Sequence, residues 1–243
     1  MSTKRAQWSG HLGFILAAAG SAIGLGNLWK FPYITWHNEG GAFVLVYLLC
    51  IALVGFPIMV AEIMIGRKTQ KSAVGAMRDA AGSKWAAVGG LGVVAGFVIL
   101  SYYSVVAGWA LQYFVKCLGW SNGGYVAGAA GEGFGALVVD GPLQITLAAI
   151  FLGATAAVIL AGVGRGIERV ARVLMPVLFA ILLVMLFTAL RMEGAKEALA
   201  FIFRPNFAEL PPAGILEALG HSFFTLSLGM GAMITYGSYL QRK

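Results

Sequence analysis

The sequence predicts an all-α integral membrane protein. Hydrophobic residues make up 59% of the 243 residues and charged residues only 11%, whereas soluble domains carry about 25% charged residues. The apolar residues gather in six runs, and each is about as long as the roughly 20 residues that a helix needs to cross the hydrocarbon core. The 34 glycines suit close packing between such helices and breaks within them.

The six predicted spans follow one another with short connections and form a single transmembrane domain, residues 1–243. They cover about residues 12–36, 41–66, 88–118, 143–161, 170–190 and 213–240. The third is long enough to tilt strongly or to project from the bilayer. The following loop, 119–142, is rich in glycine and has no strong periodicity. Residues 193–201 fit a short surface helix, closed by the prolines after it.

The basic residues predict the orientation. Twelve gather on one side: Lys4, Arg5, Arg67, Lys68, Lys71, Arg78, Lys84, Arg165, Arg169, Arg172, Arg242 and Lys243. The other side holds five: Lys30, Lys116, Arg191, Lys196 and Arg204. Loops rich in Lys and Arg stay in the cytoplasm, so we expect a cell-membrane protein with both termini cytoplasmic. Basic residues in short loops, rather than on one face, argue against nucleic-acid binding.

The first span is interrupted by glycines at mid-depth, where residues 20–32 read GSAIGLGNLWKFP. Glycine lets the backbone leave helical geometry, and exposed backbone is tolerated in a bilayer only where it lines a protein cavity or a ligand. The same glycines would also suit a helix-packing face, but Asn27 and Lys30 favour a binding site. The sixth span has a similar interruption, SLGMG at residues 227–231.

Enzyme chemistry is not indicated. The sequence has no nucleophile–base constellation, phosphate-binding loop or cluster of metal ligands at suitable spacing. Cys50 and Cys117 lie far apart in or beside apolar runs, where free thiols behave as small apolar residues. An N-terminal signal peptide is disfavoured, because the apolar run continues past the small residues through Phe31.

Six sequence features, in order along the chain, resemble the neurotransmitter:sodium symporter family. They are Trp8, residues 20–32, NEGGAF at 38–43, GFPIMVAE at 55–62, Tyr102-Tyr103 and FFTLSLGMG at 223–231. Bacterial sodium-dependent amino-acid transporters are the branch they resemble most. The resemblance implies the inverted-repeat, leucine-transporter-like fold, of which this chain would hold the first five-helix repeat and the sixth helix.

The resemblance also implies a function: sodium-coupled symport of a neutral, hydrophobic or aromatic amino acid into the cell. The chain would be the N-terminal half of such a transporter, apparently truncated relative to the family. It could act with a separate C-terminal half or with a second copy of itself. The alternative is a non-transporting remnant or a membrane scaffold that binds a partner. We expect no nucleic-acid partner.

Sodium is a hard cation that prefers oxygen ligands, which an interrupted helix can supply as backbone carbonyls. By resemblance, the carbonyls of Gly20 and Ile23 would bind one sodium ion. The carbonyl of Ala22, the side-chain oxygen of Asn27 and Thr225 would bind the other. In an uninterrupted helix Asn27 could instead bond a neighbouring helix. No other metal is expected.

A substrate carboxylate suits backbone N–H groups at the N-terminus of a half-helix, where the helix dipole is positive. By resemblance, Leu25 and Gly26 supply these groups and the Tyr103 hydroxyl donates a further bond, although Tyr103 could also be a packing aromatic. The remaining implied contacts are carbonyls for the ammonium group and side chains that line the pocket: Phe224, Thr225, Ser227, Ile99 and Met230.

Two positions bear on substrate choice. Family members that carry monoamines have an aspartate where this chain has Gly24, so the substrate here must bring its own carboxylate, as amino acids do. Met230 stands where many members have phenylalanine. Methionine is flexible, which favours a larger or aromatic substrate side chain.

The resemblance assigns gating and support roles as well. Glu62 lies at membrane depth, where a carboxylate is functional or strongly paired; it would hold exposed N–H groups of the broken helices, with proton transfer as the alternative. Arg5 and Trp8 correspond to the cytoplasmic gate. Lys30 corresponds to the basic member of the outer gate.

A possible anion site is implied at two further positions. Tyr47 and His221 stand where the family has its chloride-related site, and His221 replaces a common glutamine. A core histidine explains His221 equally well. Chloride dependence is therefore left undetermined.

Overall fold

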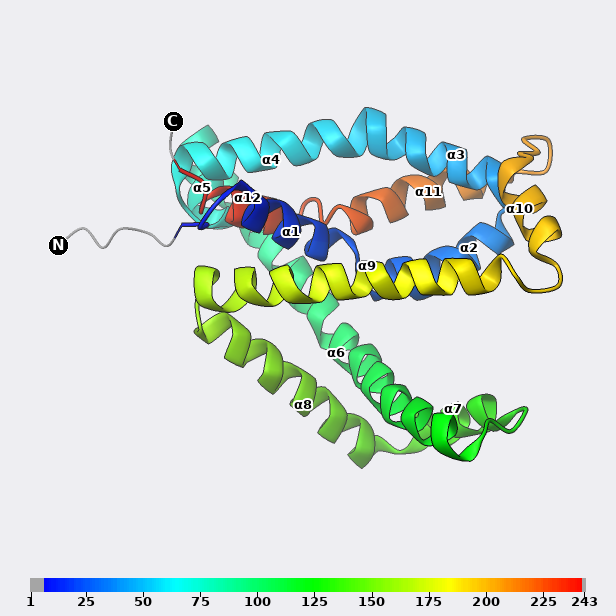
Figure 1. Ribbon diagram of the computed structural model, residues 1–243. Coiled ribbons are helices and arrows are strands. Elements are labelled where there is room, and N and C mark those ends of the chain that lie inside the picture. The colour runs from blue at the N-terminus through cyan, green and yellow to red at the C-terminus, as the bar shows by residue number, and fades with distance from the viewer. Residues whose placement is uncertain (1–6, 242–243) are drawn as a thin grey trace. The chain divides into compact units, whose positions relative to one another are not determined.

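The computed structural model describes residues 7–241, and all the regular elements in that range are helices. In chain order they are α1 (His11–Ala22), η1 (Gly26–Lys30), α2 (Phe31–His37), α3 (Gly41–Cys50), η2 (Ile51–Gly55), α4 (Phe56–Thr69), α5 (Ala73–Ala81), η3 (Ser83–Trp85), α6 (Ala86–Gly123), α7 (Ala129–Val139), α8 (Gly141–Leu160), η4 (Val163–Glu168), α9 (Arg169–Ala189), α10 (Ala195–Phe203), α11 (Pro212–Thr225) and α12 (Ala232–Gly237). They form two compact units (Figure 1). The first unit contains residues 7–93 and 163–241, and the second contains residues 94–162.

Within residues 7–241, four helices are long and apolar enough to cross a membrane, and a bent helix pair makes a fifth segment if it is counted as one span. Four are continuous helices: Gly41–Thr69, Ser83–Gly123, Gly141–Leu160 and Val163–Ala189. The fifth is the pair His11–Ala22 and Gly26–His37, bent by 50° at the glycine-rich break. The segment expected at 170–190 begins earlier, because η4 continues directly into α9. The predicted sixth span consists of two short helices, α11 and α12, with a six-residue connection, and the count of six stays a prediction.

In the first unit α12 packs along α4 and α11 along α3 (Figure 1). The α4–α12 contact is made by the backbone itself. A Cβ atom at Gly66 would collide with the carbonyl of Ile234, and one at Gly237 would collide with that of Ile63. The α3–α11 contact instead buries side chains around Phe43, which is fully buried. The two halves of the interrupted sixth segment are thus each fixed to the second segment.

The surface helix expected at 193–201 is confirmed as α10, Ala195–Phe203. It packs onto the start of α3, where Gly40 and Gly41 lie against the backbone carbonyls of Phe201 and Ile202. Gly40 has φ +64°, a conformation that glycine adopts without a Cβ penalty. Two glycines therefore allow α10 to close over this end of the unit.

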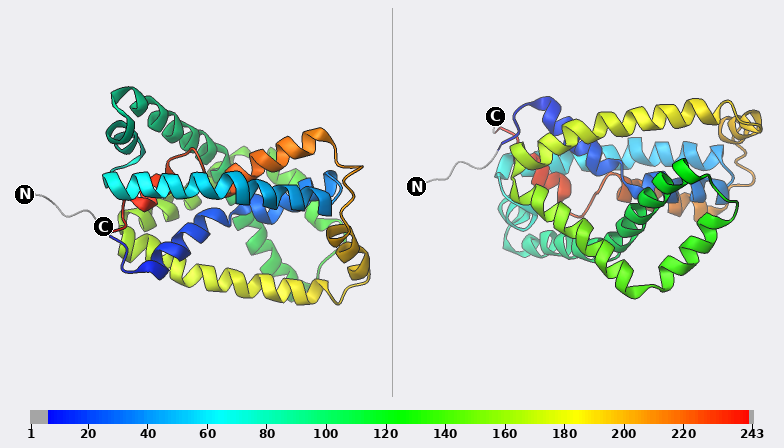
Figure 2. Two further views of the ribbon diagram at one scale, coloured as in Figure 1. Left: turned by 90° about the horizontal axis from the view of Figure 1, so that it is seen from above. Right: turned by 60° about the horizontal axis from the view of Figure 1, so that its bottom comes forward.

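The second unit joins α6, from Val94 onward, to α7 and α8 (Figure 2). Here the interpretation of 119–142 as an irregular loop is wrong, because it ignored the aromatic contacts that hold a helix in place. The helix is α7: the Trp109 and Phe134 rings meet edge to face at 5.2 Å, and the Tyr113 hydroxyl donates to the Ala130 carbonyl at 2.5 Å. The Asp140 side chain then caps α8 by accepting from the Leu143 N–H at 3.0 Å.

Candidate functional site

The first break separates α1 from η1 through residues 23–25. The α1 helix ends when Ile23 leaves helical geometry at φ −96° and ψ 89°. The carbonyl of Gly24 then accepts from the Asn27 N–H at 3.0 Å, and the chain continues as a π-helix, Gly26–Lys30. The break is short and helical geometry resumes at once, so few backbone groups lose their partners.

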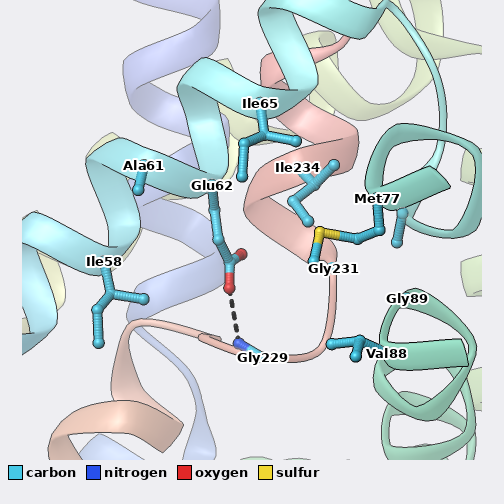
Figure 3. A pocket seen from close by; sticks show the side chains of 11 residues that line it. Ile58, Ala61, Glu62, Ile65, Met77, Val88, Gly89, Gly229, Gly231 and Ile234 are labelled. Atoms are coloured by element: carbon cyan, nitrogen blue, oxygen red, sulfur yellow. Dashed lines mark hydrogen bonds between the residues drawn. The ribbon is translucent and has the colours of Figure 1, made fainter. Parts of the chain in front are cut away.

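The second break covers residues 226–231, between α11 and α12. Ser227, Gly229 and Gly231 all have positive φ, at +54°, +77° and +73°. Glycine accepts this geometry freely, but a left-handed serine costs roughly 1–2 kcal/mol. The Gly229 N–H donates to the Glu62 carboxylate at 2.8 Å (Figure 3), which is the contact proposed for Glu62 from the sequence.

A chain of hydrogen bonds joins the two breaks. The Asn27 side-chain amide donates to the Ala22 carbonyl at 2.6 Å, and its oxygen accepts from the Thr225 hydroxyl at 3.0 Å. The Tyr47 hydroxyl donates to Thr225 Oγ1, also at 3.0 Å. Three oxygens predicted to bind one sodium ion therefore lie in one connected cluster. Such neutral oxygens are ligands that a hard cation accepts.

Ser21 belongs to this junction although the sequence assigned it no role. Its hydroxyl lies 3.2 Å from that of Ser227, and the Ser227 hydroxyl also reaches the Ser21 carbonyl at 3.4 Å. A hydroxyl residue just before the first break and another within the second were a signal for this pairing. Helix spacing could not reveal it, because Ser227 faces Ser21 only through its left-handed backbone.

The other predicted ligands divide between the units. Gly20 lies at the end of α1 beside the Met175 side chain of α9, and Ile23 follows at the break. Three predicted substrate residues lie in the breaks, Leu25, Ser227 and Met230, while Gly26 begins η1 and Phe224 lies near the end of α11. Ile99 and Tyr103 lie one turn apart on α6 in the second unit, where the Tyr103 ring meets that of Tyr102 edge to face at 5.5 Å.

The predicted cytoplasmic-gate residue Trp8 is buried against the end of α12. Its indole N–H donates to the Tyr236 carbonyl at 3.0 Å, and its backbone N–H donates to the Tyr239 carbonyl at 3.2 Å. The rings of Phe14, Tyr236 and Tyr239 surround it edge to face. Arg5 lies outside the described residues. Lys30 is exposed at the end of η1.

The proposed anion-site residues are neighbours, but they do not bond each other. The rings of Tyr47 and His221 are 5.6 Å apart, and the Tyr47 hydroxyl is committed to Thr225. His221 stacks on Phe31 at 5.5 Å, and its buried Nε2 has no hydrogen-bond partner within residues 7–241. The ring stacking is typical of a core histidine, whereas the unpartnered Nε2 could still form a hydrogen bond with a bound group.

An ionic cluster around Glu168 was not predicted from the sequence. Glu168 is 1% exposed, and its carboxylate accepts from the Ser9 N–H at 2.9 Å, from the Ser9 hydroxyl and from Arg172 at 2.6 Å. Gly13 leaves room for this carboxylate against α1. Glu168 is the one acidic residue among Arg165, Arg169 and Arg172, and this pattern could have predicted an ion pair. The sequence analysis used only the three arginines, as evidence for the orientation in the membrane.

Comparisons with known proteins agree with the motifs. A model of the sodium:neurotransmitter symporter family matches residues 5–123 and 135–243. The sodium-dependent transporter YhdH of Bacillus subtilis is 44% identical over 98% of this chain and 53% of its own length. The sodium-dependent transporter MJ1319 of Methanocaldococcus jannaschii is 36% identical over 99% of this chain and 50% of its own.

A solved structure is also similar. The crystal structure of MhsT in complex with L-phenylalanine matches with a TM-score of 0.88 and 46% identity, over 98% of this chain and 54% of that one. The leucine-transporter-like fold expected from the motifs is therefore confirmed for the matched region. The chain spans about half the length of the curated relatives it matches.

Proposed function

The chain belongs to the sodium:neurotransmitter symporter family, and from this premise we propose that it provides the N-terminal half of a sodium-coupled amino-acid symporter. Family membership makes it a multi-pass membrane protein of a sodium-dependent transporter family rather than an enzyme. The observation that carries the proposal is the hydrogen-bonded junction of Ala22, Asn27 and Thr225 between two interrupted helices.

We assign one sodium ion to that junction. Bound sodium would replace the hydrogen bonds that now join Ala22, Asn27 and Thr225, since each of these residues would turn an oxygen toward the ion. The carbonyls of Gly20 and Ile23 would serve a second ion. These five residues offer carbonyl, amide and hydroxyl oxygens rather than carboxylates, and such neutral oxygens are suitable ligands for a hard cation.

We assign the substrate to the space between the breaks, and we propose a neutral amino acid with a hydrophobic or aromatic side chain. The N–H groups of Leu25 and Gly26 begin a half-helix, which favours a carboxylate. Gly24 supplies no competing anion. MhsT, a structural relative, binds L-phenylalanine, and Met230 offers a flexible wall for such a ring. Ile99 and Tyr103, which belong to the second unit, stay predicted substrate contacts on the resemblance alone.

Uptake into proteoliposomes tests this function. The chain, alone and co-expressed with the second half of a related transporter, is given radiolabelled phenylalanine with and without an inward sodium gradient. We expect sodium-dependent accumulation with the added half, at least tenfold lower for Asn27→Ala and unchanged for Asn206→Ala, an exposed asparagine outside the breaks. If the amount of phenylalanine in the vesicles were the same with and without the sodium gradient in both preparations, the result would favour the non-transporting scaffold.

We also propose six spans in a single transmembrane domain with both termini cytoplasmic. The support is the basic-residue asymmetry together with the membrane-length helices. Single cysteines at Glu132 and Lys71, in a background lacking Cys50 and Cys117, test it with a membrane-impermeant thiol reagent. Position 71 should react only from the cytoplasm and position 132 only from outside.

A further inference from the structure

A cavity of about 230 Å³ lies beside the second break, between α4, α5 and the first turns of α6 (Figure 3). Its walls are apolar and include Ile58, Ile65, Met77, Val88 and Ile234. Val88 is 45% exposed, so this wall reaches the surface of the unit. The cavity is large enough for a compact organic molecule, since one water occupies about 30 Å³ of liquid.

Glu62 contributes the one ionisable side chain that lines the cavity among residues 7–241. The side chain is 8% exposed. One carboxylate oxygen accepts the Gly229 N–H at 2.8 Å (Figure 3), whereas the other, Oε2, is buried without a hydrogen-bond partner in the described chain. Buried polar atoms of native proteins are nearly always partnered, so Oε2 is an acceptor that calls for a donor.

The Glu62 carboxyl group also has no basic partner among the described residues. Within the described range the ion pairs are Lys71–Asp79 and Arg172–Glu168, and neither involves Glu62. A charge taken out of water is normally paired or hydrogen-bonded at each available site. Glu62 has one of these bonds and no counter-charge, so a ligand that brings both a proton donor and a positive charge would complete the site.

We propose that this cavity binds a compact tertiary ammonium ion. Its single N–H group matches the single free acceptor, and its three alkyl groups match the apolar walls. A primary ammonium would bring three donors, two of them without acceptors here. Sodium would need several oxygens, which the apolar side chains around Glu62 do not supply. The ligand would bridge α4 and the second break.

Calorimetric titration of the purified chain in detergent tests the site. The probe is triethylammonium, with tetraethylammonium as a matched cation that lacks the N–H group, both at neutral pH. We expect saturable binding of triethylammonium and at least tenfold weaker binding of tetraethylammonium. Glu62→Gln should weaken triethylammonium binding at least tenfold because it removes the charge. Glu132→Gln, which removes an exposed carboxylate of α7, should bind like the parent chain.

A second variant keeps the test decisive if Glu62→Gln does not fold. Val88→Phe fills the cavity from its exposed rim without altering the carboxylate, and it should also weaken binding at least tenfold. Absence of saturable binding to the parent chain would overturn the proposal. Equal binding of the two cations, or undiminished binding to Val88→Phe, would do so too, because both would place the cation elsewhere.

Discussion

The two breaks solve the same problem in different ways. The first keeps its donors local: the Asn27 N–H donates to the Gly24 carbonyl and its side-chain amide to the Ala22 carbonyl, while only the Asn27 side-chain oxygen reaches the other segment, at Thr225. The second has three residues with positive φ and depends on side chains from elsewhere, including Glu62 of α4 and Ser21 of α1. Two helices interrupted by glycines in the same chain therefore differ in how far each break supports its own conformation.

The largest expected difference in the free energy of unfolding is between alanine substitutions at two glycines: Gly24 in the first break and Gly66 on α4, which packs against α12 after the second break. Gly66→Ala places a methyl group against the Ile234 carbonyl, whereas Gly24→Ala meets no atom within 4 Å. We expect Gly66→Ala to lower the free energy of unfolding by about 3 kcal/mol, as strong overpacking does. Gly24→Ala should change it by less than about 0.5 kcal/mol, as substitutions at open sites do.

Thermal and denaturant unfolding of the two variants in the same detergent measures this difference. If they were equally destabilised, the α4–α12 contact would not be the rigid support of the second break. Gly237→Ala, which meets the carbonyl of Ile63, is a second probe of that contact and should behave like Gly66→Ala.

A smaller effect is expected at Glu62. Glu62→Leu removes the acceptor of the Gly229 N–H, and an unsatisfied buried group costs about 1–3 kcal/mol. Glu62→Gln retains an oxygen for that N–H and removes the buried charge, so it should retain most of the stability. Unfolding midpoints measure both variants. A glutamine variant as unstable as the leucine variant would show that the charge itself supports the break.

The link between the breaks should be measurable as a coupling energy. Thr225→Val removes the hydroxyl between Tyr47 and Asn27, and Asn27→Ala removes the partner in the first break. In a double-mutant cycle, residues in one hydrogen-bond network couple by about 0.5–3 kcal/mol, and we expect about 1 kcal/mol. Additive effects would mean that the breaks are stabilised independently. Sodium should stabilise the parent chain but not Asn27→Ala.

Sequence alone predicted both breaks, because glycines inside an apolar run have a direct physical meaning in a bilayer. Through the motif it also assigned Glu62 to exposed N–H groups of the broken helices, without saying which break the carboxylate would contact. The Ser21–Ser227 contact was not predictable, because it depends on a left-handed backbone at Ser227 that no local pattern specifies. Glu168 was missed for another reason: Arg172 is its i,i+4 neighbour and could have been paired with it from the sequence, but Ser9 becomes a partner only when the chain folds back beside η4.

The smallest predicted effect concerns Ser227, where two contributions oppose each other. Ser227→Ala loses the contact with Ser21 and keeps the left-handed backbone, so it should cost about 1 kcal/mol, the value of one hydrogen bond. Ser227→Gly loses the same contact but removes the left-handed penalty of roughly 1–2 kcal/mol, against an added backbone entropy of about 0.5–1 kcal/mol.

The glycine variant should therefore be more stable than the alanine variant and within about 0.5 kcal/mol of the parent chain, the usual range for mild substitutions. Ser21→Ala is a control for the contact between the two hydroxyls, since it deletes that contact from α1, where the backbone is helical, and keeps the Ser21 carbonyl as an acceptor for the Ser227 hydroxyl. It should lose no more stability than Ser227→Ala. If Ser227→Gly were instead the least stable of the three, the left-handed serine would not be strained. The second break would then resemble the first in supporting its own conformation.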